Sequence, residues 1–146
     1  MARIEVHELM SCRLGFTGTR KGMTKKQKTV LTSEVIVANP HEFHDGDCVG
    51  SDEEAHAIVT KVIGCRMVGH PPDNDKARAH CMYDMNYLPK PYLDRNREIV
   101  DDVDHVIATP DTMKEKERGG TWYTIRYARK QGRKLTIIYP DGTIGE

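Results

Sequence analysis

A pair of glycines, Gly119 and Gly120, is the feature of this sequence that most clearly predicts chemistry. The pair stands between a polar stretch and a run of helical character that begins at Thr121. Glycines at such a junction let the backbone approach a ligand closely, and the first N–H groups of a helix, together with its dipole, attract negative charge. We therefore interpret this stretch as a cradle for an anion, most simply a phosphate, in which Thr121 caps the helix and offers a hydroxyl. The alternative is an ordinary turn before a helix.

Two other loops carry side chains suited to a phosphorylated ligand. In residues 18–23, Arg20 could pair with a phosphate through two parallel hydrogen bonds, although an arginine in solvent is the simpler interpretation. In the second loop, residues 46–52, the side chains of Asp47, Ser51 and Asp52 could bind a ribose or a base. Ser51 is more simply explained as a helix cap, because it begins a capping-box pattern.

Strand-like and helix-like runs alternate along the chain and must position these loops. Runs typical of strands are residues 13–17, 42–44, 65–69, 104–110 and 135–139, and runs typical of helices are residues 24–39, 51–62, 93–101 and 121–131. Such alternation predicts βαβ units. The expected fold is therefore α/β: a single Rossmann-like domain with a mainly parallel sheet of about five strands and helices on both faces. All three loops then lie at the carboxyl ends of strands, where such sheets bind ligands.

Composition places the chain among globular proteins with one domain. It has 146 residues, 38% of them hydrophobic, and its 22 Lys and Arg residues balance 22 Asp and Glu residues. This balance argues against a nucleic-acid partner, which usually requires a basic surplus. The sequence shows no apolar run of membrane-spanning length and no signal-peptide pattern, and its four cysteines form no CxxC pair. We expect a cytoplasmic protein with reduced cysteines and no membrane partner.

Four segments resemble the SLOG superfamily of Rossmann-like nucleotide-binding domains. They are residues 15–20 (GFTGTR), residues 46–56 (GDCVGSDEEAH), residues 95–100 leading into the strand at 104–109, and residues 119–121 with the helix that ends at residues 132–133. The superfamily includes the LOG phosphoribohydrolases and the DNA-processing protein DprA. The resemblance implies a nucleotide-binding domain over residues 13–146, preceded by an arm or edge strand in residues 1–12.

Departures from the LOG pattern favour binding over hydrolysis. LOG enzymes have a proline before the glycine pair and a glutamate soon after the Gly-Thr that follows, whereas here Arg118 precedes the pair and no carboxylate follows Thr121 closely. We therefore expect the protein to sense or sequester a nucleotide or nucleotide-derived signal.

Two alternatives remain open. The first is a nucleotide N-glycosidase of the LOG type. Asp47 and Glu117 are its weak catalytic candidates, and Asp52 and Glu115 are further candidates. The second is a DprA-like module associated with DNA, which would bind single strands in a salt-dependent way.

The expected ligand-binding residues lie in the three loops and in the segments that lead to them. Phosphates are expected against residues 119–121 and 18–20, and base or ribose against residues 46–52 and 70–72. The full predicted set is Thr17, Gly18, Thr19, Arg20, Gly46, Asp47, Gly50, Ser51, Asp52, His70, Pro71, Arg95, Arg97, Pro110, Arg118, Gly119, Gly120, Thr121 and Trp122.

Several of these residues have a second interpretation. One of Arg95 and Arg97 is expected at the ligand and the other in a surface ion pair. Trp122 either stacks on a base or packs against the sheet or a partner subunit, and packing is favoured. No metal and no cofactor is expected, because histidines and cysteines show no zinc-type spacing.

The polar stretch at residues 73–91 is long for a connection in a compact domain, which is typical of functional or mobile segments. Residues 76–82 within it are expected to form a short helix. We also expect a homo-oligomer that buries the helix faces around Trp122 or the segment at residues 83–92.

Overall fold

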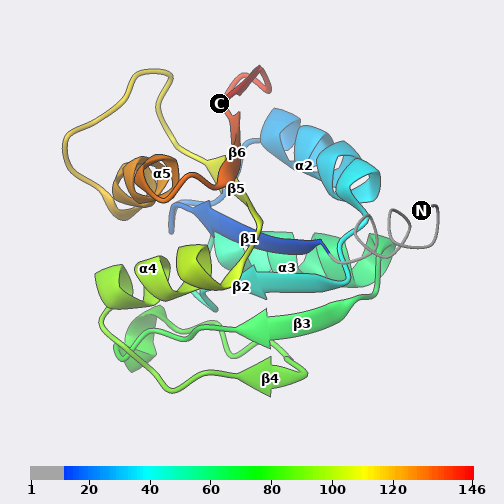
Figure 1. Ribbon diagram of the computed structural model, residues 1–146, viewed down its shortest axis with the longest axis vertical. Helices are drawn as coiled ribbons and strands as arrows, with labels where there is room; N and C mark the ends of the chain where they lie inside the picture. The colour runs from blue at the N-terminus through cyan, green and yellow to red at the C-terminus, as the bar shows by residue number, and fades with distance from the viewer. Residues whose placement is uncertain (1–11) are drawn as a thin grey trace.

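The computed structural model describes residues 12–146, in which strands and helices alternate through most of the chain (Figure 1). The strands are β1 (Arg13–Gly18), β2 (Glu42–Asp45), β3 (Arg66–Gly69), β4 (Met85–Asn86), β5 (His105–Thr109), β6 (Lys134–Ile138) and β7 (Ile144–Gly145). The helices are α2 (Lys25–Ala38), α3 (Ser51–Val62), the 3-10 helix η1 (Asp75–Ala77), α4 (Tyr92–Asp102) and α5 (Gly120–Lys130). The arm or edge strand expected at the N-terminus lies outside the described residues, apart from Cys12.

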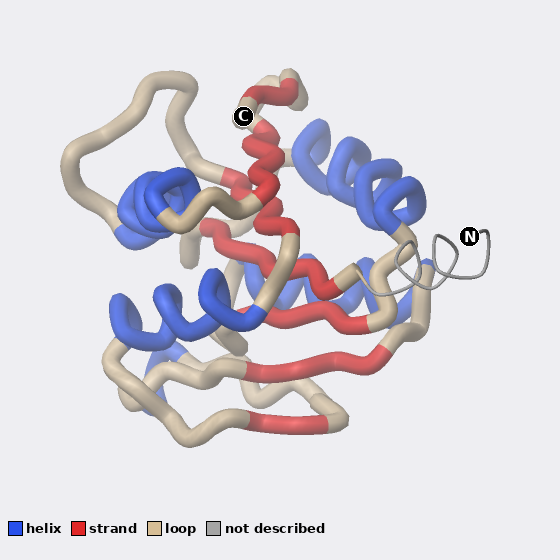
Figure 2. Tube along the Cα trace, in the orientation of Figure 1, coloured by secondary structure: helices blue, strands red, loops and turns tan. Residues whose placement is uncertain are grey.

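The strands form one sheet in the order β4-β3-β2-β1-β5-β6-β7, and all neighbouring pairs are parallel except β6 and β7. The strands turn progressively from β4 to β6 (Figure 2), which is the twist expected of a sheet. The predicted α/β fold with a mainly parallel sheet is confirmed. The predicted number of strands was too low, because β4 and β7 have two residues each, too few for a periodic pattern to mark them.

Helices cover both faces of the sheet, as predicted. On one face, α2 and α3 pack on a cluster that contains Phe16 of β1 and Phe43 of β2, whose rings lie 6.3 Å apart. On the other face, Val100 of α4 and Ile125 of α5 belong to a second cluster. Alternate side chains of a strand point to opposite faces, so the central strands contribute to both cores.

Gly15 lets α4 lie close against β1. A β-carbon added at Gly15 would lie 2.9 Å from a methyl group of Ile99 and 2.9 Å from a methyl group of Val103. Both distances are shorter than ordinary van der Waals contact, so a larger residue at this position would push α4 away from the sheet.

Helix α2 begins and ends as predicted. The Thr24 hydroxyl accepts a hydrogen bond from the Gln27 backbone N–H at 3.0 Å, and the Gln27 side chain accepts one from the Thr24 N–H at 2.9 Å. These two bonds make the predicted capping box. The helix ends at Asn39, which has a left-handed backbone conformation and precedes Pro40.

The predicted caps of α3 and α5 were wrong. Gly50, with a φ of +93°, occupies the N-cap position of α3, and Ser51 is the first helical residue. Gly119, with a φ of +108°, occupies the N-cap position of α5, so Thr121 already lies inside the helix. At both positions a backbone conformation that only glycine adopts easily turns the chain into the helix, and neither helix has a side-chain cap.

The stretch at residues 73–91 is mostly irregular. Of the short helix predicted at residues 76–82, only the part that overlaps η1 is present, and the remainder of the prediction was wrong. The polar stretch instead adds β4 beside β3 and passes on into α4. Within residues 12–146, no helix is both long and apolar enough to cross a bilayer.

Candidate functional site

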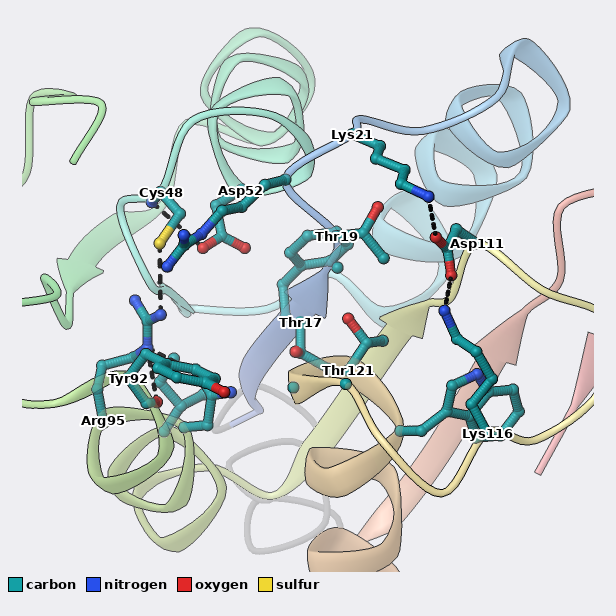
Figure 3. A pocket seen from close by; sticks show the side chains of 18 residues that line it. Thr17, Thr19, Lys21, Cys48, Asp52, Tyr92, Arg95, Asp111, Lys116 and Thr121 are labelled. Atoms are coloured by element: carbon teal, nitrogen blue, oxygen red, sulfur yellow. Dashed lines mark hydrogen bonds and ion pairs between the residues drawn. The ribbon is translucent and has the colours of Figure 1, made fainter. Parts of the chain in front are cut away.

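A cavity opens at the carboxyl ends of β1 and β5, as the predicted topology implied. The chain continues from β1 to the β2 side of the sheet, whereas β5 lies on the other side of β1, so the order of connection reverses between these strands. Ligands of open parallel sheets bind at such a point. The cavity has a volume of about 390 Å³, which suits a small molecule, and side chains from several elements surround it (Figure 3).

The cavity brings together residues from all three predicted loops and from α4. The predicted residues that line it are Thr17, Gly18, Thr19, Arg20, Asp52, Arg95, Gly119, Gly120, Thr121 and Trp122. The predicted residues that do not line it are Gly46, Asp47, Gly50, Ser51, His70, Pro71, Arg97, Pro110 and Arg118.

Several residues outside the cavity have structural contacts instead. Asp47 is buried; its carboxylate accepts hydrogen bonds from the Arg78 side chain at 3.1 Å and from the Cys81 backbone N–H at 2.9 Å. Arg97 forms the expected surface ion pair, with Asp94 on the same helix. These contacts hold loops and a helix in place.

Part of the cavity lining was not predicted from the sequence. The missed residues are Phe16, Lys21, Cys48, Tyr92, Asn96, Ile99, Asp111 and Lys116. A signal existed for one group of them, because Tyr92, Asn96 and Ile99 recur at the spacing of a single helix face. Lys116 had no such signal, since it lies in an irregular loop between β5 and α5 that extends widely from the sheet (Figure 1).

The buried side chain of Arg95 lies across the floor of the cavity and forms hydrogen bonds to several segments. Its Nη1 group donates to the backbone carbonyl of Gly46 and, at 3.1 Å, to that of His70. Its Nε donates to Asn96 Oδ1 at 2.7 Å, and its Nη2 donates to Cys48 Sγ at 3.3 Å. Arg95 therefore joins α4 to the loops after β2 and β3, and its charge remains close to the cavity.

Asp52 faces the same floor from α3 (Figure 3). Burial raises the pKa of Asp52 to about 7; the Arg95 charge opposes this rise, and the nearby Asp45 carboxylate adds to it. The backbone N–H of Cys48 donates to the Asp52 carboxylate at 3.3 Å. Near neutral pH the Asp52 side chain can therefore exchange a proton with a bound ligand.

Cationic side chains surround the opening of the cavity. Lys21 and Lys116 approach the Asp111 carboxylate at 3.3 Å and 3.0 Å, so Asp111 connects the loop after β1 to the loop after β5 (Figure 3). Arg20 lies over the ring of Tyr92, with its guanidinium carbon 6.0 Å from the ring centre. Within residues 12–146, Arg20 has no ion-pair partner, which leaves its charge available to an anion.

Among residues 12–146, three hydroxyl groups beside the cavity have no hydrogen-bond partner. They belong to Thr19, Ser51 and Thr109, and all three oxygen atoms are buried. Two of them gather around Gly18, where an added β-carbon would lie 2.5 Å from Thr109 Oγ1 and 3.0 Å from Ser51 Oγ. Buried polar groups normally have partners, so this cluster is suited to an ordered water molecule or a polar ligand atom.

The start of α5 lies at the cavity, where the glycine pair was expected. Gly119 and Gly120 line the cavity together with Thr121, and the Tyr92 ring lies over Gly120. Trp122 is only 3% exposed, and its indole N–H donates to Thr112 Oγ1 at 3.0 Å. The favoured prediction of packing therefore describes Trp122 better than stacking on a base, while the exposed ring of Tyr92 remains accessible.

The fold and the cavity together define a Rossmann-like α/β domain with a cavity at the switch point of its sheet. No protein-family model matches the sequence, and no curated protein matches it in sequence. Solved structures with the same fold include the molybdenum cofactor binding protein of the phototrophic bacterium Rippkaea orientalis. It has a TM-score of 0.69 and 19% identity over 88% of this chain and 77% of that one.

Two further structures share the fold. The molybdenum cofactor carrier protein of Chlamydomonas reinhardtii has a TM-score of 0.61 and 14% identity over 87% of this chain and 76% of that one. DNA processing protein A of Streptococcus pneumoniae has a TM-score of 0.62 and 18% identity over 88% of this chain and 50% of that one. The present chain thus spans half of the DprA chain. At these identities the likeness establishes the fold, which confirms the predicted SLOG resemblance at that level.

Proposed function

We propose that the protein binds a nucleotide or a nucleotide-like small molecule, with its phosphate group in the cavity between β1 and β5. The observation that carries this proposal is the meeting of Arg20, Lys21 and Lys116 with the start of α5 around one cavity. Cationic side chains and a helix N-terminus each favour an anion. Their combination at a topological switch point is typical of phosphate recognition.

The remaining lining accounts for the other parts of such a ligand. Tyr92 is 45% exposed at the edge of the cavity and offers a ring face on which a heterocycle can stack. Thr17 and Thr19 offer hydroxyl groups at the end of β1, suited to a sugar or a similar polar group. A phosphate near Arg20 and a ring against Tyr92 are compatible, because those two side chains are neighbours, with the guanidinium carbon 6.0 Å from the ring centre.

Related folds widen the range of ligands to be tested. Two of the similar structures are, by name, proteins that bind or carry the molybdenum cofactor. That cofactor therefore belongs beside the nucleotides as a candidate ligand. The mechanism that we propose is recognition, in which the protein senses, carries or sequesters the ligand.

A second candidate function is hydrolysis of the N-glycosidic bond of a nucleotide, and the position of Asp52 favours it. Asp52 is a cavity carboxylate with a pKa raised to about 7 by burial, as general acids and bases often have. Asp47 and Glu117, the carboxylates singled out from the sequence, do not line the cavity. If the protein is a glycosidase, Asp52 is therefore the residue that we expect to act near the ribose.

The test is to incubate the purified protein with a panel of mono-, di- and cyclic nucleotides and the molybdenum cofactor. The protein is separated by filtration and denatured, and both fractions are analysed by HPLC. Depletion of one compound from the filtrate, with its intact recovery from the denatured protein, is the expected result. Release of free base, abolished in Asp52→Asn, would establish the second candidate. Binding of no compound in the panel would contradict the proposal.

A further inference from the structure

Two buried histidines meet on the face of the sheet that α4 covers, away from the cavity lining. His44 lies on β2 and His70 directly follows β3. The distance from His44 Nδ1 to His70 Nε2 is 2.8 Å, and the two side chains are almost fully inaccessible to solvent. The register of β2 and β3 brings these residues together although they are 26 positions apart in the sequence.

The outer nitrogen of each ring faces a carboxylate. His44 Nε2 lies 2.8 Å from Glu42 Oε1, and His70 Nδ1 lies 2.7 Å from Glu98 Oε1. An ionised carboxylate only accepts hydrogen bonds, so each outer nitrogen must carry the ring proton. A neutral imidazole has only one N–H group. The two inner nitrogens, His44 Nδ1 and His70 Nε2, are then both lone-pair acceptors that face each other at hydrogen-bonding distance.

Two facing lone pairs repel each other unless a proton or a metal ion lies between them. Imidazoles whose outer N–H groups are held by carboxylates are the usual arrangement of histidines that bind a metal, because the carboxylate fixes the tautomer and orients the ring. Asp102, at the end of α4, supplies a third donor: one ligand atom from each of His44, His70 and Asp102 lies within 4.8 Å of the other two. Two imidazoles and a carboxylate suit zinc and similar divalent ions.

We propose that His44, His70 and Asp102 bind one divalent transition-metal ion, of which Zn²⁺ fits the donor set best, with Glu42 and Glu98 as supporting carboxylates. Metal–ligand bonds of about 2.0–2.1 Å place the donors of a tetrahedral site roughly 3.3 Å apart. The two rings therefore need to separate by a fraction of an ångström, and Asp102 has to move inward. A water molecule completes the coordination.

The surroundings of the pair are compatible with an ion. Asp102 and Glu98, the carboxylate that contacts His70, also line a shallow hollow on the surface. The three carboxylates outnumber the cations that pair with them, namely Lys90 with Glu98 and Arg66 with Glu42. The ion would fasten α4 to β2 and β3. No metal was predicted from the sequence, because these donors come from separate elements and show no characteristic spacing.

The experiment uses the full chain without an affinity tag, treated with chelator and dialysed against Zn²⁺, with bound metal measured by mass spectrometry. Titration with Co²⁺ adds a visible absorption spectrum that reports the coordination geometry. We expect one ion per chain and a higher melting temperature when the ion is bound. Replacing the buried histidines risks unfolding the chain, so the partly exposed carboxylates carry the test.

Asp102→Asn is expected to weaken metal binding at least tenfold, and Glu42→Gln about 10- to 100-fold, the usual effect of losing a supporting carboxylate. The matched controls are Asp101→Asn on the same helix and the double variant His41→Gln, His80→Gln, which removes exposed histidines. Both controls are expected to bind within twofold of the wild type. The proposal is overturned if the wild type retains no stoichiometric ion, which is the result expected if the two histidines share a proton instead. It is also overturned if Asp102→Asn and Glu42→Gln bind the ion as tightly as the wild type does.

Discussion

The carboxylate of Asp52 and the guanidinium of Arg95 close around the α-carbon of Gly46 at the floor of the cavity. A β-carbon added at Gly46 would collide with Arg95 Nη1 and lie 2.7 Å from Asp52 Oδ2. Gly46 therefore contributes to the site by leaving room for two charged groups, although it does not line the cavity itself. Burial raises the pKa of Asp52 to about 7 despite the opposing effect of Arg95, so the charge at the floor changes near neutral pH.

Binding of a phosphorylated ligand should weaken as the pH rises through about 7. A bound anion repels ionised Asp52 and so raises the pKa of Asp52. At a pH above this pKa, the ligand must bind against the negative charge of the carboxylate. We expect a roughly tenfold loss of affinity between pH 6 and pH 8, equivalent to about 1.4 kcal/mol of repulsion. Calorimetric titration of the wild type and Asp52→Asn measures it. Ionisation of the ligand changes both affinities equally, so its effect cancels in their ratio. A ratio that stays constant with pH would refute the role of Asp52.

Tyr92→Leu should separate recognition of the ring from recognition of the phosphate. Stacking of a heterocycle on an exposed aromatic side chain contributes about 1–3 kcal/mol in nucleic-acid sites. The variant should therefore bind the ring-containing ligand at least fivefold more weakly and bind ribose 5-phosphate, which has no base, almost unchanged. Equal losses for both ligands would show that Tyr92 acts through the position of Arg20 rather than through stacking.

Gly50 and Gly119 form a matched pair for stability. Both have positive φ, +93° and +108°, but an added β-carbon meets the Arg20 backbone at Gly50 and nothing within 4 Å at Gly119. Gly119→Ala should cost only backbone strain, about 1–3 kcal/mol. Gly50→Ala adds a steric collision worth roughly 1–3 kcal/mol more. Urea denaturation measures both free energies of unfolding, and equal costs would contradict this account of the α3 start.

His105 should make the fold sensitive to acid. Burial, with a smaller contribution from the Lys134 charge, lowers the pKa of His105 to about 4. The unfolded chain takes up this proton near pH 6.5 and the folded chain does not, so stability is complete above that pH and declines as the pH falls toward 4. The loss reaches roughly 3 kcal/mol, at about 1.4 kcal/mol per pKa unit.

His105→Gln keeps a polar partner for Thr136 Oγ1, which lies 2.8 Å from His105 Nε2, but cannot be protonated. Its free energy of unfolding should fall less steeply between pH 6.5 and pH 4 than that of the wild type. His41→Gln, at an exposed position, should follow the wild type. Parallel curves for the wild type and His105→Gln would show that His105 titrates normally.

The regular part of this fold could be predicted from the sequence because alternating strands and helices leave periodic patterns. The two-residue strands β4 and β7 leave none, since pairing with β3 and β6 defines them. The wrong caps at Ser51 and Thr121 have one cause. A capping residue offers hydrogen bonds that its side chain can make, but it does not reveal that a glycine at positive φ will take the N-cap position, one residue before Ser51 in α3 and two residues before Thr121 in α5.

The candidate site was predictable where it follows directly from strand ends. Thr17 to Arg20 leave β1 at the switch point, and topology alone places them in the cavity. Lys116 comes from a long loop. The path of this loop depends on the ion pair of Lys116 with Asp111 and on the hydrogen bond from Arg126 to the Lys116 carbonyl. The facing of His44 and His70 depends on strand register, which no local pattern in either segment specifies.

The most direct test of the central claim is a calorimetric titration with the nucleotide or cofactor that the protein retains. It compares the wild type with Arg20→Met and Arg118→Met. Both arginines were predicted from the sequence to bind the ligand, but only Arg20 lines the cavity, and Arg118 is exposed outside it. We predict one ligand per chain, affinity reduced about tenfold or more in Arg20→Met by the loss of a charge-assisted hydrogen bond, and wild-type affinity in Arg118→Met. Wild-type affinity in Arg20→Met, or a loss confined to Arg118→Met, would contradict a phosphate site in this cavity.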